Sequence, residues 1–499
     1  MKKLLQYLGN YKKESILGPL FKLLEASFEL IVPLVMAAII DTGVANADRP
    51  YIMKMSLVLF LLALIGLVCA ITAQYFAAKA AVGCATGLRH ALFEHIETLS
   101  FTEMDTVGTS TLITRMTSDV NQVQNGVNLV LRLFLRSPFI VFGAMVMAFT
   151  IDVKAALVFV VTIPLLSVVV FGIMLVSIPL YKKVQAALDK VLGITRENLT
   201  GSRVIRAFNK EQDEIAQFHE DNEALTKIQL YVGKISALMN PLTYIIINGA
   251  IVVLVWVGAI RVDNGNITQG QVVALVSYMS QILVELIKLA NLIININKSI
   301  ACMNRIETVL DMESSITEHP AAETGSLTSD GAGREGKETI PTENAVVFSR
   351  VGLTYAGASE EALSDIDFTV RRGETIGIIG GTGSGKSSVV NLIPRFYDAT
   401  RGEVLVDGKN VRDYTLEELR AKVGVVLQKA VLFKGTIREN LSWGNSDATD
   451  EEIIAAAKAS HAHGFIKRLP EGYDTVIAED GGNLSQGQKQ LLCIARVER

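Results

Sequence analysis

Long uncharged stretches dominate the first three hundred residues of this chain. Four of them contain 24, 27, 26 and 21 residues without a charge, and they begin directly after Lys54, Lys154, Lys234 and Asp263. About 20 consecutive apolar residues are enough for a helix to cross the hydrocarbon core of a bilayer. These four stretches are therefore predicted to be membrane spans.

Two weaker stretches extend the same pattern. Residues 16–40 are apolar apart from Lys22, Glu25 and Glu29, and residues 137–151 are uncharged but short unless extended backwards through VNLVLRLFLR. We therefore expect six spans. The basic, amphipathic N-terminal segment MKKLLQYLGNYKK lacks the apolar core and cleavage site of a signal peptide, so we expect it to lie at the membrane interface.

The positions of Lys and Arg predict the topology. These residues gather in the N-terminal segment and in two long loops, residues 79–136 and 181–234, whereas the other loops are short. Cytoplasmic segments of membrane proteins carry an excess of positive charge, so we place the N-terminus and both long loops in the cytoplasm. Both loops contain apolar residues at helical spacing and few prolines, so the spans are predicted to continue beyond the bilayer as helices.

A few charges lie inside the predicted spans. Glu25 and Glu29 are four residues apart, on one face of the first span. A carboxylate is costly within a membrane, so this pair could attract cationic compounds; bonding to neighbouring helices or water is the alternative we favour. Glu285 and Lys288 are one turn apart in the sixth span and are predicted to pair with each other, with a place along a transport pathway as the alternative.

The composition changes after Asp311. Residues 312–344 contain no aromatic residue and are rich in Gly, Ser, Thr and Glu, which is typical of a flexible linker. Residues 345–499 have the pattern of a soluble α/β domain. The expected elements are strands at residues 375–380, 403–409 and 422–428, and a helix at residues 450–460.

The sequence GGTGSGKS at residues 380–387 fits the phosphate-binding P-loop pattern, and it lies between a predicted strand and an apolar helix. Its glycines allow backbone N–H groups to turn towards phosphate oxygens. Lys386 would interact with the β- and γ-phosphates, and Ser387 would bind Mg²⁺ through its hydroxyl. The residues expected at the nucleotide are Gly380, Gly381, Thr382, Gly383, Ser384, Gly385, Lys386, Ser387 and Ser388.

A second motif, NLSQGQKQLLCIAR, begins at residue 483. Ser485 and Gln488 are predicted to form a capping box at the start of an apolar helix. A helix N-terminus beside a glycine, here Gly487, can bind an anion. Taken alone, an ordinary helix cap is the simpler interpretation; a P-loop about 100 residues upstream favours a ligand site.

The overall composition excludes other classes. The chain of 499 residues is 50% hydrophobic and 20% charged, with a net charge of −4, so it lacks the basic excess of a nucleic-acid-binding protein. Its four cysteines show no CxxC spacing, which indicates neither a disulfide scaffold nor a zinc site.

The motif LSQGQ resembles the signature of ATP-binding cassettes, and the whole chain resembles an ABC exporter half-transporter of the bacterial multidrug type. This implies an all-α transmembrane domain of six helices in residues 1–311, a linker, and an α/β P-loop cassette domain in residues 345–499. ATP and Mg²⁺ are the implied cofactors. By the same resemblance, Tyr355 stacks on adenine, Lys386 and Gln428 take part in catalysis, and Gln428 joins Ser387 at Mg²⁺.

The resemblance also implies a second half-transporter, identical or related. In the family, each γ-phosphate lies between one subunit's P-loop and the other's signature, here Ser485, Gly487 and Gln488, while Glu479 matches a loop that contacts the partner. The implied function is ATP-driven export of small amphipathic compounds (drugs, lipids or peptides) across the cytoplasmic membrane by alternating access. The nucleotide-binding domain would lie in the cytoplasm.

Two features depart from the family pattern. Gln486 replaces the first glycine of the usual signature. The family places its Walker B strand, catalytic glutamate and switch histidine beyond the position of Arg499, so we expect a truncated product or a fragment, incomplete at its C-terminus. The alternative function is therefore a partner or regulatory subunit that binds nucleotide without hydrolysing it.

Overall fold

The computed structural model describes residues 2–317, 343–478 and 481–498. The chain divides into two compact units. Residues 1–97 and 110–311 form the first, here called the helical unit. Residues 98–109 and 312–499 form the second, called the cassette unit. Of the predicted linker, residues 318–342 lie outside the described residues, and the predicted domain limits stay predictions.

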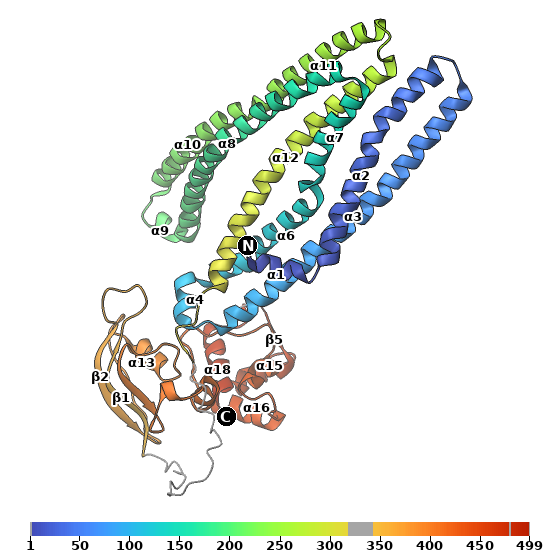
Figure 1. Cartoon of the computed structure of the whole chain (residues 1–499). Coiled ribbons are helices and arrows are strands. Elements are labelled where there is room, and N and C mark those ends of the chain that lie inside the picture. Colours follow the sequence, from blue (N-terminus) through green and yellow to red (C-terminus); the bar gives the residue numbers. More distant parts are fainter. Residues whose placement is uncertain (1, 318–342, 479–480, 499) are drawn as a thin grey trace, which may run out of the picture. The chain divides into compact units, whose positions relative to one another are not determined.

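The helical unit is built from long helices that run side by side (Figure 1). They are α1 (Lys2–Gly9), α2 (Lys12–Ala38), α3 (Arg49–Thr98), α5 (Thr109–Thr114), α6 (Val120–Leu129), α7 (Arg136–Ile151), α8 (Val153–Thr200), α9 (Ser202–Ala207), α10 (Glu211–Ala237), α11 (Met239–Asp263) and α12 (Gln269–Leu310). Three π-helical segments join them: η1 (Ile39–Val44), η2 (Arg115–Asp119) and η3 (Val130–Phe134).

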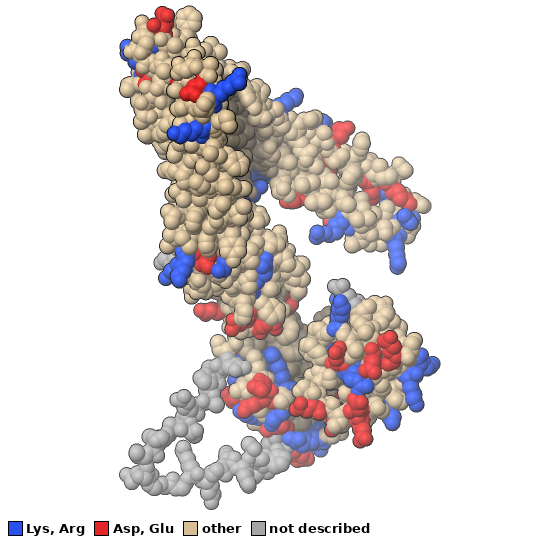
Figure 2. Space-filling model, turned by 90° about the vertical axis from the view of Figure 1, so that its right-hand side faces the viewer, with Lys and Arg blue, Asp and Glu red and all other residues tan. Residues whose placement is uncertain are grey.

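Six helical stretches within the described residues are long and apolar enough to cross a membrane, which confirms the predicted number of spans. They are Lys12–Val44, Arg49–Thr98, Thr109–Ile151, Val153–Thr200, Glu211–Asp263 and Gln269–Leu310. The two long loops are largely helical, as predicted, because α3, α8 and α10 continue through them. In Figure 2 the middle of the helical unit is almost free of charged atoms, which gather towards the ends of its helices.

The core of the helical unit lies where α12 packs against α2, α7, α8 and α11. Tyr278 of α12 is fully buried, and its hydroxyl donates a hydrogen bond of 2.6 Å to the backbone oxygen of Leu30. Small residues allow α2 to approach α3 closely: a Cβ atom at Gly18 would lie 3.3 Å from the backbone nitrogen of Ala77. Because lipid does not drive helices together as water does, such close packing is a main source of their association.

The described part of the cassette unit contains two small sheets and several short helices. The larger sheet is antiparallel, in the order β2-β1-β3-β4. Its strands are β1 (Asn344–Leu353), β2 (Leu363–Arg371), β3 (Arg401–Val406) and β4 (Lys409–Asn410), and β5 (Gly435–Thr436) pairs with β6 (Val476–Ile477). The helices are α4 (Phe101–Val107), α13 (Lys386–Leu392), α14 (Leu416–Lys422), α15 (Ile437–Leu441), α16 (Asp450–Ala459), α17 (His463–Ile466) and α18 (Gln486–Val497).

Local sequence explains several of these elements. Asp407 and Gly408 both have positive φ, at 50° and 78°, and they form the tight turn between β3 and β4 that the predicted strand at residues 403–409 requires. The predicted helix at residues 450–460 is confirmed as α16, and Thr449 caps it in a capping box with Glu452. These elements therefore follow from residues close together in the chain.

Two strand predictions are wrong. Residues 375–380 and 422–428 are not strands in the structure, although both are apolar. A strand is defined by hydrogen bonds to a neighbouring strand, and the described residues contribute no such partner to either segment. Their side chains accordingly remain accessible, with Ile379 97% exposed and Leu427 50% exposed. Periodicity detects an apolar segment but not the partner it needs.

Candidate functional site

The P-loop has the backbone shape that its glycines allow. Gly383 and Gly385 have φ values of +83° and +81°, which residues with a Cβ atom rarely adopt. At Gly385 a Cβ would also lie 2.5 Å from the Leu363 side chain and 3.0 Å from the backbone oxygen of Ala362. The loop leads directly into α13, and its N-cap, Gly385, has no side chain to cap the first backbone N–H groups. Free N–H groups at such a position can bind phosphate oxygens.

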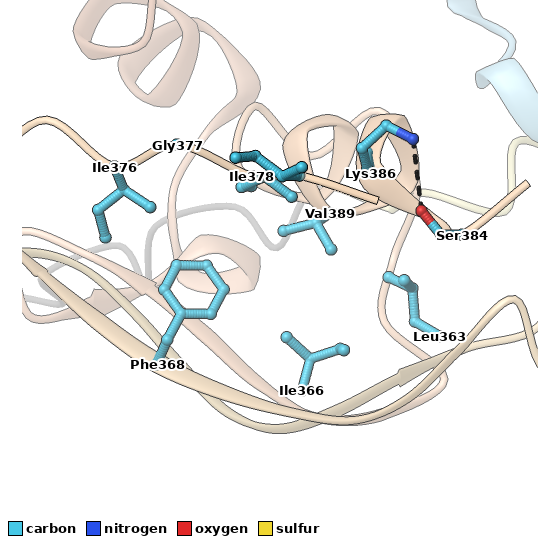
Figure 3. Close-up of a pocket in the computed structure, with 10 residues that line it drawn as sticks. Leu363, Ile366, Phe368, Ile376, Gly377, Ile378, Ser384, Lys386 and Val389 are labelled. Atoms are coloured by element: carbon cyan, nitrogen blue, oxygen red, sulfur yellow. Dashed lines mark hydrogen bonds between the residues drawn. The ribbon is translucent and has the colours of Figure 1, made fainter. Parts of the chain in front are cut away.

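Lys386 lies over its own loop. Its ammonium group donates hydrogen bonds to the backbone oxygens of Gly380 at 2.9 Å and Gly381 at 2.7 Å, and it lies 3.4 Å from the Ser384 hydroxyl (Figure 3). Phosphate oxygens are charged and so are stronger acceptors than these neutral carbonyls. The lysine therefore has a position from which it can exchange loop carbonyls for a bound triphosphate.

The two serines after this lysine differ in their surroundings. Ser387 is exposed, and within the described part of the chain its hydroxyl makes no hydrogen bond, so it fits the oxygen ligand that Mg²⁺ requires. Ser388 is buried, and its hydroxyl accepts a hydrogen bond of 2.8 Å from the hydroxyl of Tyr355. Tyr355, the residue expected at adenine, is thus connected to the helix that carries the P-loop lysine.

Two residues of α4, Phe101 and Asp105, extend this connection through Phe396 and Tyr397. Sequence reasoning missed these contacts. The ring of Tyr397 packs edge-on against Tyr355, with ring centroids 5.1 Å apart, and its hydroxyl donates a hydrogen bond to the Asp105 carboxylate. Phe101 packs on Phe396 at 4.7 Å. Burial and then the bond to Asp105 raise the pKa of Tyr397. Phe101 and Asp105 lie almost 300 residues before Tyr397, so no local pattern connects them.

An apolar hollow of about 430 Å³ lies beside the P-loop (Figure 3). Its lining comes mainly from β2, the segment after it and α13, and consists of Leu363, Ile366, Phe368, Ile376, Gly377, Ile378, Ile379 and Val389, with Ser384 and Lys386 at one end. A triphosphate needs hydrogen-bond donors, which this apolar wall lacks. The phosphate cradle is therefore the loop backbone itself and not the hollow.

The second motif begins α18 as predicted. Ser485 is the N-cap, and the capping box is confirmed: its hydroxyl accepts from the Gln488 backbone at 3.3 Å, and the Gln488 side chain accepts from the Ser485 backbone at 2.8 Å. A Cβ at Gly487 would meet nothing within 4 Å, so the start of the helix is open. Among the described residues, no hydrogen bond joins Ser485 to the P-loop.

Gln428 is exposed, on the segment that fails to form the third predicted strand. Its neighbour Leu427 is tied to the signature helix, since the Gln490 side chain donates a hydrogen bond of 3.4 Å to the backbone oxygen of Leu427. No hydrogen bond joins Gln428 to Ser387 within the described ranges. Thr382, another residue expected at the nucleotide, is exposed on the P-loop. Glu479 lies outside the described residues.

The charges predicted inside the spans form a buried network. Arg136 of α7 is 7% exposed and bonds to Glu285 of α12 at 2.7 Å and to Glu29 of α2 at 2.6 Å. Glu285 also accepts from Lys288 at 2.8 Å, which confirms that predicted pair. Glu25 pairs with Lys22 at 2.5 Å. The bond of Glu29 agrees with the favoured interpretation that the carboxylates bond to neighbouring helices, whereas Glu25 pairs with a lysine of its own helix, α2.

Comparison with known proteins covers both units. The family described as the ABC transporter transmembrane region matches residues 15–286, and the family described as ABC transporter matches residues 363–498. An uncharacterized ABC transporter ATP-binding protein of Mycobacterium tuberculosis is 34% identical over 98% of this chain and 82% of its own length. A Bacillus subtilis protein named for multidrug export, an ATP-binding/permease protein, is 34% identical over 100% of this chain and 84% of its own length. The ATP-dependent lipid A-core flippase of Desulfotalea psychrophila is 33% identical over 81% of this chain and 68% of its own length.

The family matches include most of the six apolar helical stretches and the whole P-loop. A membrane domain and an ATP-binding domain in one chain define the half-transporter architecture, in which ATPase activity is coupled to transport. The chain therefore belongs to the ABC exporter family, as a multi-pass membrane half-transporter that binds ATP.

Proposed function

We propose that this chain is one subunit of an ATP-driven exporter that moves small amphipathic compounds across the cytoplasmic membrane by alternating access. The observation that carries the proposal is the P-loop conformation, with Lys386 held over the loop, in the same chain as six apolar spans. Relatives named for multidrug export and for lipid A-core flipping support an amphipathic substrate.

In this proposal the loop from Gly380 to Gly385 cradles the phosphates, and Lys386 neutralises charge on the β- and γ-phosphates. Tyr355 would stack on adenine, and Ser387 with Gln428 would hold Mg²⁺, which would supply positive charge beside the phosphates. The exposed Ser387 hydroxyl supports this role. Because no hydrogen bond joins the P-loop to Ser485 within the described residues, we assign Ser485, Gly487 and Gln488 to the γ-phosphate bound by a second half-transporter.

The proposed orientation places the N-terminus, the two long loops at residues 79–136 and 181–234, and the cassette unit in the cytoplasm. It rests on the excess of Lys and Arg in the N-terminal segment and in residues 79–136 and 181–234. ATP binding would then close two cassette units on each other and bias the helical units towards one of two states.

Transport into inverted vesicles tests the proposal. The full chain, expressed with whichever partner co-purifies, should give uptake of a fluorescent amphiphile that depends on ATP, and Lys386→Ala should abolish it. Lys434→Ala is the matched control, because Lys434 is an exposed lysine in the same unit. Uptake that survives Lys386→Ala, or that needs no ATP, would contradict the proposal. ATP binding without turnover in the assembled dimer would favour the regulatory subunit instead.

A further inference from the structure

Polar side chains lie in a row where η3 and the adjoining ends of α6 and α7 pack against α12. Asn128, Arg132 and Arg136 follow one another at four-residue intervals, and Gln281 lies on α12 one turn before Glu285. Within the described part of the chain, one side-chain atom in each of four of these residues is buried without a hydrogen-bond partner: Asn128 Oδ1, Arg132 Nε, Arg136 Nε and Gln281 Oε1. Buried polar atoms are nearly always satisfied by protein, water or ligand.

Two bonds set the register between α12 and the helical segment formed by α6, η3 and α7. Arg136 bonds to Glu285, and the hydroxyl of Ser299 donates a hydrogen bond of 2.8 Å to the backbone oxygen of Gln122. Gln122 and Arg136 are as many residues apart as Glu285 and Ser299. The two segments therefore run antiparallel in constant register. Arg132 therefore lies about one turn from the Arg136–Glu285 pair, where η3 packs against α2 and α12.

The charges of the buried network balance without Arg132. Arg136 and Lys288 neutralise Glu29 and Glu285, as their bonds show. Arg132 is half-buried, and the described residues supply it with no ion-pair partner. Arg132 lies at the proposed cytoplasmic end of the apolar part of the third stretch, and its buried Nε atom has no hydrogen-bond partner among the described residues, so an anion at this end of the stretch would satisfy it. Its position on a π-helical segment agrees, because such segments occur often at functional sites.

The chemistry of this site favours an anion. A guanidinium group presents a planar set of N–H donors that matches the oxygens of a phosphate or carboxylate. A cationic ligand would need a free carboxylate, but Glu29 and Glu285 are both already bonded to Arg136. The unpartnered oxygen of Asn128, about one turn from Arg132, could in addition accept a hydrogen bond from a hydroxyl group on the same ligand or from water.

We propose that Arg132 binds the anionic headgroup of an amphiphile, with a phosphate or carboxylate at the guanidinium and the apolar tail among the spans. This inference deepens the proposed export function, because it names the charge class of the transported or regulatory amphiphile. It concerns a contact within the helical unit and requires neither ATP nor the cassette unit.

Binding to the unmodified chain gives the first test. The full chain is placed in phosphatidylcholine nanodiscs, and binding of dodecyl phosphate is compared with that of dodecyltrimethylammonium and dodecyl maltoside, each corrected for empty nanodiscs. The three probes share one tail and differ in headgroup charge. Dodecyl phosphate is expected to bind about tenfold more tightly than the other two. Equal binding of the three probes would overturn the proposal.

Substitutions then locate the contact. Arg132→Gln should remove the preference for dodecyl phosphate, whereas Arg132→Lys, which retains the charge, should keep at least a third of the affinity. Arg203→Gln is the matched control, because Arg203 is exposed on α9. An Arg132→Gln protein that elutes normally and keeps the preference would refute the assignment, and so would Arg132→Lys if it lost as much affinity as Arg132→Gln.

Two further comparisons identify the source of the ligand and distinguish this inference from the proposed export function. If phosphatidylglycerol in the nanodisc competes with dodecyl phosphate, the site takes a bilayer lipid; if it does not, the site takes an amphiphile from water. Either result supports an anionic headgroup at Arg132. Because this assay contains no ATP, failed transport with intact binding refutes only the export function, and intact transport without headgroup preference refutes only this inference.

Discussion

Three glycines of the P-loop provide a graded test of how the site is held. Gly381 has an ordinary φ, and a Cβ there would meet nothing within 4 Å. Gly383 has a φ of +83° but also open space around a Cβ. Gly385 combines a φ of +81° with two close atoms, on Leu363 and Ala362, which would lie 2.5 Å and 3.0 Å from a Cβ. Alanine should therefore add no strain at Gly381 and backbone strain alone at Gly383. At Gly385 it should add backbone strain together with a steric clash.

The magnitudes follow from these differences. A residue with a Cβ in the left-handed region costs about 1–2 kcal/mol. Forcing a methyl group into a filled space typically adds about 1–3 kcal/mol. If the loop relieves this strain by leaving the phosphate-binding shape, the apparent dissociation constant rises by the same free energy. Gly383→Ala should then weaken ATP binding roughly tenfold and Gly385→Ala roughly 100-fold or more, because about 1.4 kcal/mol corresponds to a factor of ten.

The assay is equilibrium binding of a fluorescent ATP analogue to the full chain in detergent with Mg²⁺, with gel filtration to confirm that each variant folds. Gly381→Ala should bind like the unchanged protein. If Gly385→Ala bound as tightly as Gly381→Ala, the loop shape described here would not be the binding shape. If Gly381→Ala were the weakest binder, direct crowding of the phosphate, and not backbone strain, would decide the affinity.

Three other changes test contacts elsewhere in the chain. Glu285→Gln leaves the buried Arg136 with one carboxylate, so the helical unit should lose about 3 kcal/mol and unfold at a lower temperature. Tyr397→Phe removes a half-exposed bond to Asp105, so the cassette unit should lose about 1 kcal/mol. Hydrogen bonds from serines outweigh the burial that alone would raise the pKa of Glu103, so this pKa is lowered from 4.5. Its contribution to stability should be complete above pH 4.5 and should disappear as the pH falls further through the folded-state pKa, and Glu103→Gln should remove this dependence.

Thermal unfolding followed with a thiol-reactive dye can measure all three, because the four cysteines are buried. Cys493 lies in the cassette unit and the other three in the helical unit, so Cys493→Ser separates the two signals. Glu361→Gln and Tyr231→Phe are controls on exposed side chains. Variants of Glu285 or Tyr397 that unfold like these controls would contradict the predicted contributions, as would an acid transition left unchanged by Glu103→Gln.

Much of the architecture could be predicted because its causes are local. A span depends on a run of apolar residues, and the six runs reappear as helical stretches. A capping box depends on residues three apart, and Ser485 with Gln488 forms one. The P-loop glycines adopt positive φ at Gly383 and Gly385 because only the local chain has to turn. Each of these predictions needed information from a short segment alone.

The errors and omissions have a different origin, because they depend on partners far along the chain. Residues 375–380 are apolar enough for a strand, but a strand also needs a neighbour, which periodicity does not detect. The carboxylate of Asp105 reaches Tyr397 across 292 positions in the sequence, and Arg136 reaches Glu285 across 149. Spacing could indicate the Glu285–Lys288 pair, which lies on one helix, but not the arginine of another helix that completes it.

The sequence by itself therefore determined the number of spans, the phosphate loop and the family resemblance, since each rests on apolar length, glycine conformation or residues one helical turn apart. Only the tertiary structure decided which charges neutralise one another inside the helical unit, and so that Arg132 has no ion-pair partner among the described residues. It also decided that an aromatic group joins α4 to Tyr355. Ion pairing and ring packing act over a few ångströms in space, and only the packed helices bring such distant residues within that range.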